Sequence, residues 1–165
     1  KWRGVNSIVR VGVGLYGMWP SEDLHKMWKK KIELRPAMRY VTHVAQIKNI
    51  EVGESIGYGA SFTTRKNMTI AVIPQGYSNG VSRLSSNNGE VLIKGKRAKI
   101  LGRVAMNMFV VDVSQIKGVK PEDEVVILGT QKGEVIMAED IAKITQTINY
   151  EVTTRINPLL PRVII

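Results

Sequence analysis

The chain has 165 residues, of which 44% are hydrophobic and 23% are charged, a balance typical of a folded domain and not of a disordered segment. Its 24 lysines and arginines outnumber its 14 acidic residues, so the net charge is +10, and the sequence contains no cysteine. The absence of cysteine excludes a disulfide framework, a thiolate metal site and a cysteine nucleophile.

The first predicted elements are a strand and a short helix. Residues 5–17 alternate apolar and polar positions and are rich in β-branched side chains, which predicts an N-terminal strand arm. A helix is predicted to begin at Pro20 and Ser21, with two acidic residues in its first turn, and Pro36 ends it. We expect residues 1–37 to form this strand and a linker helix ahead of a separate domain.

From residue 38 onward, short runs of valine and isoleucine alternate with turns that contain glycine or asparagine. Strands that recur about every 8–12 residues with such turns are typical of all-β sandwiches and barrels. Two runs over residues 90–101 predict a hairpin with its turn at Lys94-Gly95. Residues 137–144 predict one or two helical turns, and residues 151–165 further extended segments. The predicted fold class is all-β, a β-barrel or β-sandwich domain over residues 38–165.

Several classes of function are disfavoured by what the sequence contains. His25 and His43 lie far apart, and no Walker-type phosphate loop or HExxH sequence occurs, so we expect no metal site. Basic residues are scattered and only 6% of residues are aromatic, so we expect no nucleic-acid partner. No apolar run approaches the roughly 18 residues of a membrane span. The lack of cysteine is compatible with a reducing cytoplasm, the location that we expect.

The chain begins without an initiator methionine, in a basic segment that leads at once into the predicted strand. We therefore expect the sequence to be a piece of a longer polypeptide. A piece of this kind carries only part of an active site if the site is built from two domains.

Two tyrosines beside glycines are the strongest candidates for chemistry. Tyr58 lies in the tripeptide GYG and Tyr77 in the sequence QGYSNG. The simpler interpretation is a bulge or tight turn at each; the alternative is an exposed phenol that acts as a general acid or base. Residues 103–108 are expected in a strand, with Met106 and Met108 as packing residues.

Seven segments of the chain resemble the C-terminal part of the alanine racemase family, in the family's order. They are VRVGVGLYGMWPS, LRPAM, GESIGYGASF, IPQGYSNG, ILGRVAMNMFVVDVS, DEVVILG and TINYEVTTRI. One such motif is weak evidence, whereas seven in order over nearly the whole chain are specific. Members of this family are pyridoxal-phosphate enzymes that interconvert L- and D-alanine, with an N-terminal α/β barrel and a C-terminal β domain.

The resemblance implies a homodimeric enzyme of D-alanine biosynthesis, which supplies peptidoglycan. It implies that residues 1–37 are the barrel domain's last strand with a linker helix, and that residues 38–165 are the C-terminal β domain. The family's Schiff-base lysine lies near the start of the barrel, and no lysine of this chain matches it. We expect the isolated chain to be inactive and not to hold the cofactor by itself.

The resemblance also implies roles for individual residues. Tyr58 matches the catalytic tyrosine, which faces the lysine across the substrate and reaches into the partner subunit's site. Met106 matches the residue whose backbone amide meets the substrate carboxylate. Arg10 matches the arginine beside the pyridine nitrogen, and because a guanidinium does not readily give up a proton, that nitrogen stays unprotonated. The remaining matches are the cofactor contacts Gly12, Val13 and Tyr150, and the residues of the access corridor, Tyr77, Arg83, Arg103 and Ile148.

Departures from the family pattern leave the substrate open. Ala105 and Asn107 stand where members commonly have cysteine or serine and aspartate, so a negative charge close to the carboxylate pocket is missing. The sequence GYSNG replaces the usual GYADG. The alternatives are a pyridoxal-phosphate racemase of another small amino acid such as serine, a member that has lost activity, and a basic β-barrel binding module.

Overall fold

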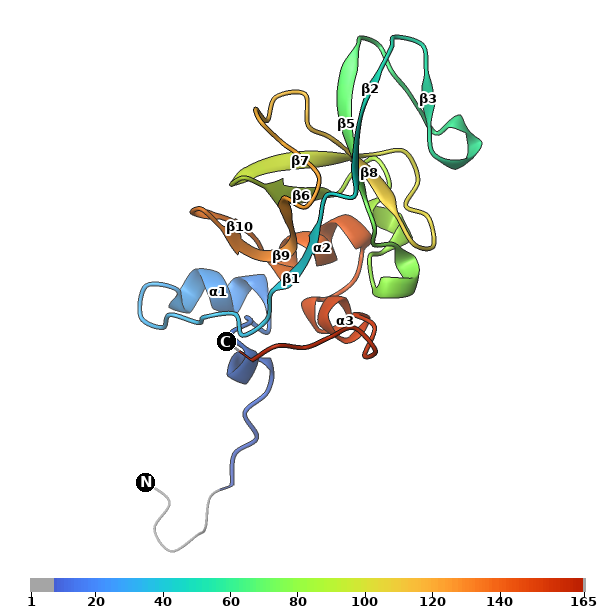
Figure 1. Ribbon diagram of the computed structural model, residues 1–165. Coiled ribbons are helices and arrows are strands. Elements are labelled where there is room, and N and C mark those ends of the chain that lie inside the picture. Colours follow the sequence, from blue (N-terminus) through green and yellow to red (C-terminus); the bar gives the residue numbers. More distant parts are fainter. Residues whose placement is uncertain (1–7, 165) are drawn as a thin grey trace, which may run out of the picture. The chain divides into compact units, whose positions relative to one another are not determined.

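The computed structural model describes residues 8–164 (Figure 1), which divide between Met38 and Arg39 into two compact units. Unit 1 holds a 3₁₀-helix, η1 (Val13–Tyr16), and one α-helix, α1 (Glu22–Trp28). Unit 2 holds the strands and the remaining helices.

The helix predicted in unit 1 is confirmed. Ser21 caps α1, because its side-chain oxygen accepts a hydrogen bond from the Leu24 amide at 3.2 Å. Glu22 and Lys26, one turn apart, form an exposed ion pair of 2.8 Å. The first turn of the helix thus carries the polar groups that the sequence assigned to it.

The strand predicted for residues 5–17 is wrong where it can be examined. Residues 5–7 lie outside the described residues, residues 8–12 have no regular structure, and residues 13–16 form η1. A strand needs a neighbour for its backbone N–H and C=O groups. Within the described part of unit 1 no strand offers that pairing, so the alternating pattern alone does not produce one.

Unit 2 is built on an eight-stranded antiparallel sheet and a small two-stranded one. The large sheet has the order β1-β9-β6-β7-β8-β5-β2, and β10 also pairs with β9. Its strands are β1 (Tyr40–His43), β2 (Gln46–Ile50), β5 (Met68–Ile73), β6 (Glu90–Ile93), β7 (Lys96–Leu101), β8 (Phe109–Asp112), β9 (Glu124–Gln131) and β10 (Glu134–Ile136). The small sheet pairs β3 (Ser55–Ile56) with β4 (Phe62–Thr63). The unit is mostly β and sandwich-like, as predicted, and the sheet is not a closed barrel.

The sheet folds over at a corner between β1 and β2. The Val44 amide donates to the Asp123 carbonyl at 3.0 Å, and the next amide, of Ala45, donates to the Val72 carbonyl at 2.9 Å. The chain therefore leaves β9 and joins β5 within two residues. Strands that change partners in this way make the corners of folded sheets.

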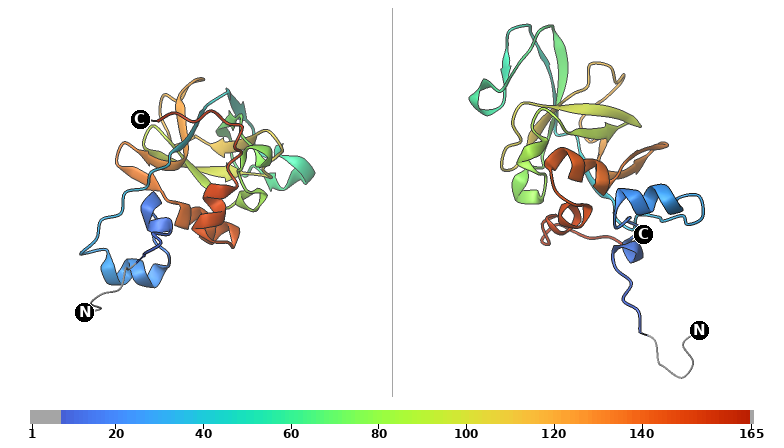
Figure 2. Two further views of the ribbon diagram at one scale, coloured as in Figure 1. Left: turned by 90° about the horizontal axis from the view of Figure 1, so that it is seen from below. Right: turned by 180° about the vertical axis from the view of Figure 1, so that it is seen from behind.

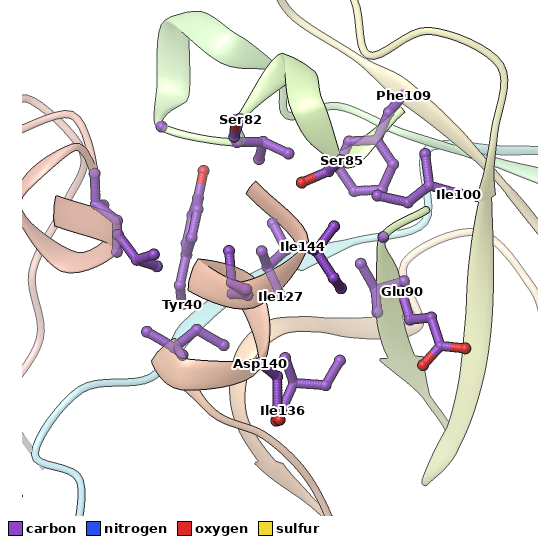
Figure 3. A pocket seen from close by; sticks show the side chains of 18 of the residues that line it. Tyr40, Ser82, Ser85, Glu90, Ile100, Phe109, Ile127, Ile136, Asp140 and Ile144 are labelled. Atoms are coloured by element: carbon purple, nitrogen blue, oxygen red, sulfur yellow. The ribbon is translucent and has the colours of Figure 1, made fainter. Parts of the chain in front are cut away.

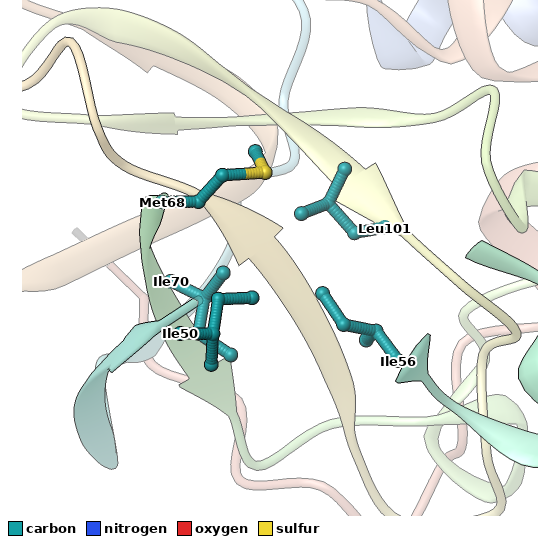
Figure 4. Close-up of a cluster of buried hydrophobic side chains, with 5 residues drawn as sticks. All are labelled: Ile50, Ile56, Met68, Ile70 and Leu101. Carbon is teal, nitrogen blue, oxygen red and sulfur yellow. The ribbon is translucent and has the colours of Figure 1, made fainter. Parts of the chain in front are cut away.

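The hairpin of β6 and β7 confirms the predicted turn. Lys94 and Gly95 both have positive φ, 53° and 75°, which is the type I′ geometry that matches the twist of the flanking strands. The β3–β4 hairpin is supported differently, by a buried cluster below it. Ile50, Ile56, Met68, Ile70 and Leu101 make up that cluster (Figure 4).

Two helices cover the other side of the core, α2 (Ala138–Thr145) and α3 (Asn149–Thr154). Ile141 of α2 packs on the buried residues Leu92, Val126 and Ile136. The two helices lie together, whereas the β2–β5 pair and the β3–β4 hairpin extend from the opposite end of unit 2 (Figures 1 and 2). The predicted helical turns over residues 137–144 are confirmed by α2.

The extended segment predicted from residue 151 is wrong over α3. Val152, Thr153 and Thr154 favour strands by local propensity. In the structure the Val152 side chain is buried, and the two threonine hydroxyls donate to carbonyls of the preceding turn. Packing against α2 therefore decides the local conformation, and the hydroxyls are satisfied within the helix.

Candidate functional site

Four of the predicted site residues, Tyr58, Tyr77, Arg103 and Met106, lie on three connected loops of unit 2, which we call the loop surface. They are residues 57–61 between β3 and β4, residues 76–80 after β5, and residues 102–108 between β7 and β8. The third loop contacts both of the others. Residues 102–108 are therefore the central loop of this surface.

Tyr58 begins a short 3₁₀-helix, η2 (Tyr58–Ala60), and its side chain is 74% exposed. Gly57 and Gly59 on either side have φ of 77° and 68°, which glycine adopts without strain. A Cβ at Gly57 would lie 2.9 Å from the Arg103 amide nitrogen, and one at Gly59 would lie 3.3 Å from Arg103 Nη1. The GYG sequence is therefore a tight turn that leaves the Tyr58 phenol exposed.

Residues 102–108 form a loop and not the predicted strand. The Ala105 amide donates to the Met108 carbonyl at 2.9 Å and closes a turn. Met106 and Met108 are 54% and 51% exposed, so the prediction that they are packing residues is wrong. Their sequence spacing resembled that of a strand, but this segment pairs with no strand among residues 8–164.

The turn of residues 76–80 is joined to the loop of residues 102–108 by backbone hydrogen bonds. The Tyr77 amide donates to the Ala105 carbonyl at 3.1 Å, and the Ser78 amide donates to the Met106 carbonyl at 3.0 Å. A Cβ at Gly76 would lie 2.3 Å from both carbonyl oxygens. Position 76 is therefore closed to any side chain as long as the two segments stay in contact.

A buried phenol supports the same turn from below. The Tyr40 hydroxyl donates at 2.7 Å to Gln75 Oε1 and lies 3.2 Å from the Asn79 carbonyl oxygen. Its burial raises the pKa of Tyr40 to about 12. The group is therefore a neutral donor at ordinary pH and serves as a fixed support, not as an acid or base.

Tyr150 lies in the first turn of α3, and Ile148 precedes that helix. Their side chains are 40% and 61% exposed. The segment after α3 is tied to the turn of residues 76–80, since Asn157 Nδ2 donates to the Ser78 carbonyl at 2.9 Å. The helix that carries the Tyr150 phenol is thus connected to the loop surface.

A shallow depression brings two of the predicted corridor residues together. Tyr77 and Arg83 line it with Leu84 and Arg155. Arg83 begins the 3₁₀-helix η4 (Arg83–Ser85), which follows η3 (Tyr77–Asn79) closely in the chain. A third predicted corridor residue, Arg103, lies instead against the Tyr58 loop.

The three remaining candidates lie in unit 1. Arg10 is exposed and belongs to the irregular segment before η1. Gly12 precedes η1, and no heavy atom lies within 4 Å of the place where a Cβ would stand. Val13 has a buried side chain, so only its backbone is available for binding. These residues are not part of the loop surface of unit 2.

An apolar cavity of about 50 Å³ lies inside unit 2, between the sheet and helices α2 and α3. Figure 3 shows isoleucine side chains, Phe109 and the Tyr40 ring around it. Ligand sites usually measure several hundred Å³. The cavity is part of the core, and the candidate site is the exposed loop surface.

The sequence interpretation missed the residues that hold the loop surface in shape. Ser78, Asn157 and Tyr40 form its supporting hydrogen bonds. The only signal for Ser78 was its place in the GYSNG sequence, beside a tyrosine already singled out. Asn157 and Tyr40 gave no signal, because each contacts the turn across a long sequence separation.

The described part of the chain contains no helix that is long and apolar enough to cross a membrane. Residues 8–164 also bring no three histidine, cysteine or acidic side chains together as a metal site would. What the loop surface does show is large apolar and aromatic side chains in contact with solvent. Exposed groups of this kind mark a surface that meets another protein region or a ligand.

Comparison with known sequences gives consistent matches. Residues 37–164 match the family model of the alanine racemase C-terminal domain. Alanine racemase 2 of Caldanaerobacter subterraneus subsp. tengcongensis is 45% identical over 158 residues, covering 96% of this chain and 40% of that protein. The alanine racemase of Desulfosudis oleivorans is 41% identical over 156 residues, covering 94% and 39%. The chain thus spans about two fifths of the length of these relatives.

Solved structures agree with the sequences. The alanine racemase of Bacillus anthracis with bound L-Ala-P superposes with a TM-score of 0.85 at 34% identity, over 95% of this chain and 40% of that one. The alanine racemase of Bartonella henselae with covalently bound pyridoxal phosphate has a TM-score of 0.77 at 30% identity, over 88% and 38%. Both matches extend over most of the residues described above.

Proposed function

The chain belongs to the alanine racemase family, and on that premise we propose that it is the C-terminal part of a pyridoxal-phosphate enzyme that interconverts L- and D-alanine. One observation carries the proposal: the tyrosine that matches the catalytic one, Tyr58, is exposed on a loop braced by two glycines and Arg103. The chain spans about 40% of its relatives' length. The barrel domain and its lysine would come from the rest of the protein.

Tyr58 is proposed as one of two bases. Pyridoxal phosphate, when bound, withdraws electrons from the α-carbon of an amino acid and makes its proton removable. Racemisation needs a proton acceptor on one face and a proton donor on the other, because a single base tends to return the proton to the side it left. A phenol on an exposed loop reaches beyond its own unit, which suits a site completed by the partner subunit.

The residues that match the family's cofactor contacts would hold the cofactor. The Arg10 guanidinium stays charged and would accompany the pyridine nitrogen without protonating it. Gly12 leaves open space where a side chain would stand, and with the Val13 backbone it would approach the phosphate. The half-exposed Tyr150 phenol would donate to a phosphate oxygen. The cofactor is an anion, and it fits the groups present. These are the Arg10 guanidinium, the open backbone at Gly12 and the Tyr150 phenol.

The substrate would be met by the central loop. The Met106 amide is proposed to bind the carboxylate, and its exposed loop allows this approach. The positive net charge of +10 suits an anionic cofactor and a carboxylate substrate. The access corridor would be lined by Tyr77, Arg83, Arg103 and Ile148.

The assembly implied by this proposal is a homodimer in the cytoplasm. Unit 1, up to about residue 37, would be the end of the barrel domain with its linker helix. Residues 38–165 would be the C-terminal β domain. The exposed Tyr58, Met106 and Ile148 would then become buried against the partner subunit and the barrel.

The replacement of Tyr58 by Phe in the complete enzyme tests the proposed base. The ring remains and the hydroxyl is lost, so racemisation should fall about 10²- to 10⁴-fold in both directions. The variant should slow the solvent exchange of the α-proton of L-alanine more than that of D-alanine, because the tyrosine faces the α-proton of the L-enantiomer. Racemisation at a near wild-type rate would leave Tyr58 as a turn residue only.

Tyr150→Phe is the matched control, because it removes another exposed phenol of the same unit. It should weaken retention of pyridoxal phosphate, measured by dialysis and absorbance, and leave the face preference unchanged. Tyr58→Phe should have the reverse pattern. If the two variants behaved alike, the separation of catalytic and cofactor roles would fail.

The isolated chain should not racemise alanine above the rate of free cofactor. No segment of it matches the lysine that carries the cofactor in the family. The measurement is D-alanine production from L-alanine after the chain is mixed with pyridoxal phosphate. Turnover above that background would contradict the assignment of this chain as one part of the site.

A serine racemase is the second candidate, and the observation that favours it is local. Asn107 places a neutral side-chain amide beside Met106. The Ser78 hydroxyl oxygen lies 2.9 Å from Asn107 Oδ1. Polar groups at this point would suit a hydroxylated side chain. Comparison of kcat/KM for L-serine and L-alanine in the complete enzyme decides between the two substrates.

A further inference from the structure

The carbonyl groups of Ala105 and Met106 point in the same direction, toward the turn of residues 76–80. The Ala105 oxygen accepts from the Tyr77 amide at 3.1 Å, and the Met106 oxygen accepts from the Ser78 amide at 3.0 Å. A Cβ on Gly76 would collide with both oxygens, at 2.3 Å each. Two hydrogen bonds therefore fix the orientation of two successive peptide groups, and the close approach at Gly76 shows how tightly the segments pack.

The N–H groups of these two peptides must point the opposite way. In a trans peptide the C=O and the N–H lie on opposite sides, and the described chain contains no cis peptide bond. The Ala105 carbonyl shares its peptide with the Met106 N–H, and the Met106 carbonyl shares its peptide with the Asn107 N–H. Neither N–H has a hydrogen-bond acceptor within residues 8–164.

Ser78 strengthens this arrangement through its side chain. Its hydroxyl lies 2.8 Å from the Met106 carbonyl oxygen, which already accepts from the Ser78 amide. It also lies 2.9 Å from Asn107 Oδ1. The hydroxyl has one proton and donates it to one of these oxygens at a time, so it supports either the peptide that follows Met106 or the Asn107 side chain, and it places no charge there.

We propose that the backbone N–H groups of Met106 and Asn107 form a pair that binds the substrate carboxylate, and that Ser78 is the residue that positions this pair. Two successive N–H groups that point to one side make a concave site for an anion. The two carboxylate oxygens match two donors. This inference rests on the proposed function and adds to it a second donor, the Asn107 amide, and a positioning residue.

The decisive experiment removes the Asn107 N–H alone. An amide-to-ester replacement at Asn107 in the complete enzyme keeps the side chain and deletes one donor. The probe is propionate, whose dissociation constant is measured by equilibrium dialysis and does not depend on turnover. We expect binding to weaken about 10-fold, as for a lost hydrogen bond to a charged group. The same replacement at the exposed Gly118 is the control and should change nothing.

Ser78→Ala tests the positioning role. This variant removes a neutral hydrogen bond, so we expect propionate to bind about 3- to 10-fold more weakly. KM should rise by the same factor, with kcat little changed. Ser78→Thr restores the hydroxyl and should restore binding. Ser114→Ala is the control, because the Ser114 hydroxyl also bonds to backbone, at Thr69, and lies outside the loop surface.

A readout on the 165-residue chain separates this inference from the proposed function. The Tyr77 and Ala105 amides are both hydrogen-bonded in the network, so Ser78→Ala should speed their hydrogen exchange several-fold. If the complete enzyme fails to racemise alanine while propionate binding and exchange respond as expected, the proposed function falls and the anion site stands. If the ester at Asn107 leaves the propionate dissociation constant unchanged, the second donor is refuted whatever the enzyme's activity.

Discussion

The core and the loop surface of unit 2 place large apolar side chains in opposite environments. In the core between the sheet and α2, Leu92 and Val126 are fully buried. On the loop surface, Tyr58 and Met106 are 74% and 54% exposed. Burial of an apolar side chain contributes directly to folding, whereas an exposed one contributes little until something covers it. The core therefore accounts for stability, and the loop surface is available for recognition.

The largest expected effect is a difference in the free energy of unfolding between a core variant and a loop-surface variant. Leu92→Ala should lower the free energy of unfolding by about 2–5 kcal/mol, because it opens a cavity in a fully buried cluster. Met106→Ala should change it by less than about 0.5 kcal/mol, since that side chain is half exposed. Urea denaturation of both variants measures the difference. Equal losses would mean that the loop surface takes part in the core after all.

Tyr40 is a buried core residue that hydrogen-bonds to the turn of residues 76–80. Its titration gives the next largest effect on stability. Burial raises its pKa to about 12 in the folded state, against about 10 in the unfolded chain. As pH rises past 10 the unfolded state loses its proton first, so the free energy of unfolding falls until about pH 12. Two pKa units correspond to about 2.7 kcal/mol, and partial solvent screening of the phenol lowers the loss to roughly 2 kcal/mol.

Tyr40→Phe isolates that contribution from the other groups that titrate at alkaline pH. The variant should lack the additional decline between pH 10 and 12, and it should lose about 1 kcal/mol at neutral pH with its hydrogen bond to Gln75. Chemical denaturation across the pH range supplies the comparison. Parallel pH curves for the two proteins would show that the phenol does not support the turn as described.

The smallest effect concerns the loop surface alone. Gly59→Ala and Gly53→Ala each force an alanine into a positive φ, which costs about 1 kcal/mol. Only Gly59 has a neighbour, Arg103, at 3.3 Å from the added methyl group, and Gly53 has none within 4 Å. Gly59→Ala should therefore be the more destabilising by a few tenths of a kcal/mol. Identical unfolding curves for the two variants would show that Arg103 does not support the Tyr58 loop.

Several features followed from the sequence itself because their causes are local. The Lys94-Gly95 turn, the Ser21 cap and the exposed GYG loop each depend on residues within a few positions of one another. Glycine permits a backbone geometry, and a serine hydroxyl satisfies a nearby amide. Motifs of this kind in family order also identified the family.

Other features were decided only by contacts between distant segments. The residues after Tyr150 form α3 because Val152 is buried beside α2, against their local preference for strands. Residues 102–108 form a loop because turn 76–80 takes up two of its carbonyls. Hydrogen bonds across such separations leave no periodic trace in the sequence. The sequence by itself therefore named Tyr58 and Met106, while the tertiary structure alone revealed Ser78 and the direction of the amides that it orients.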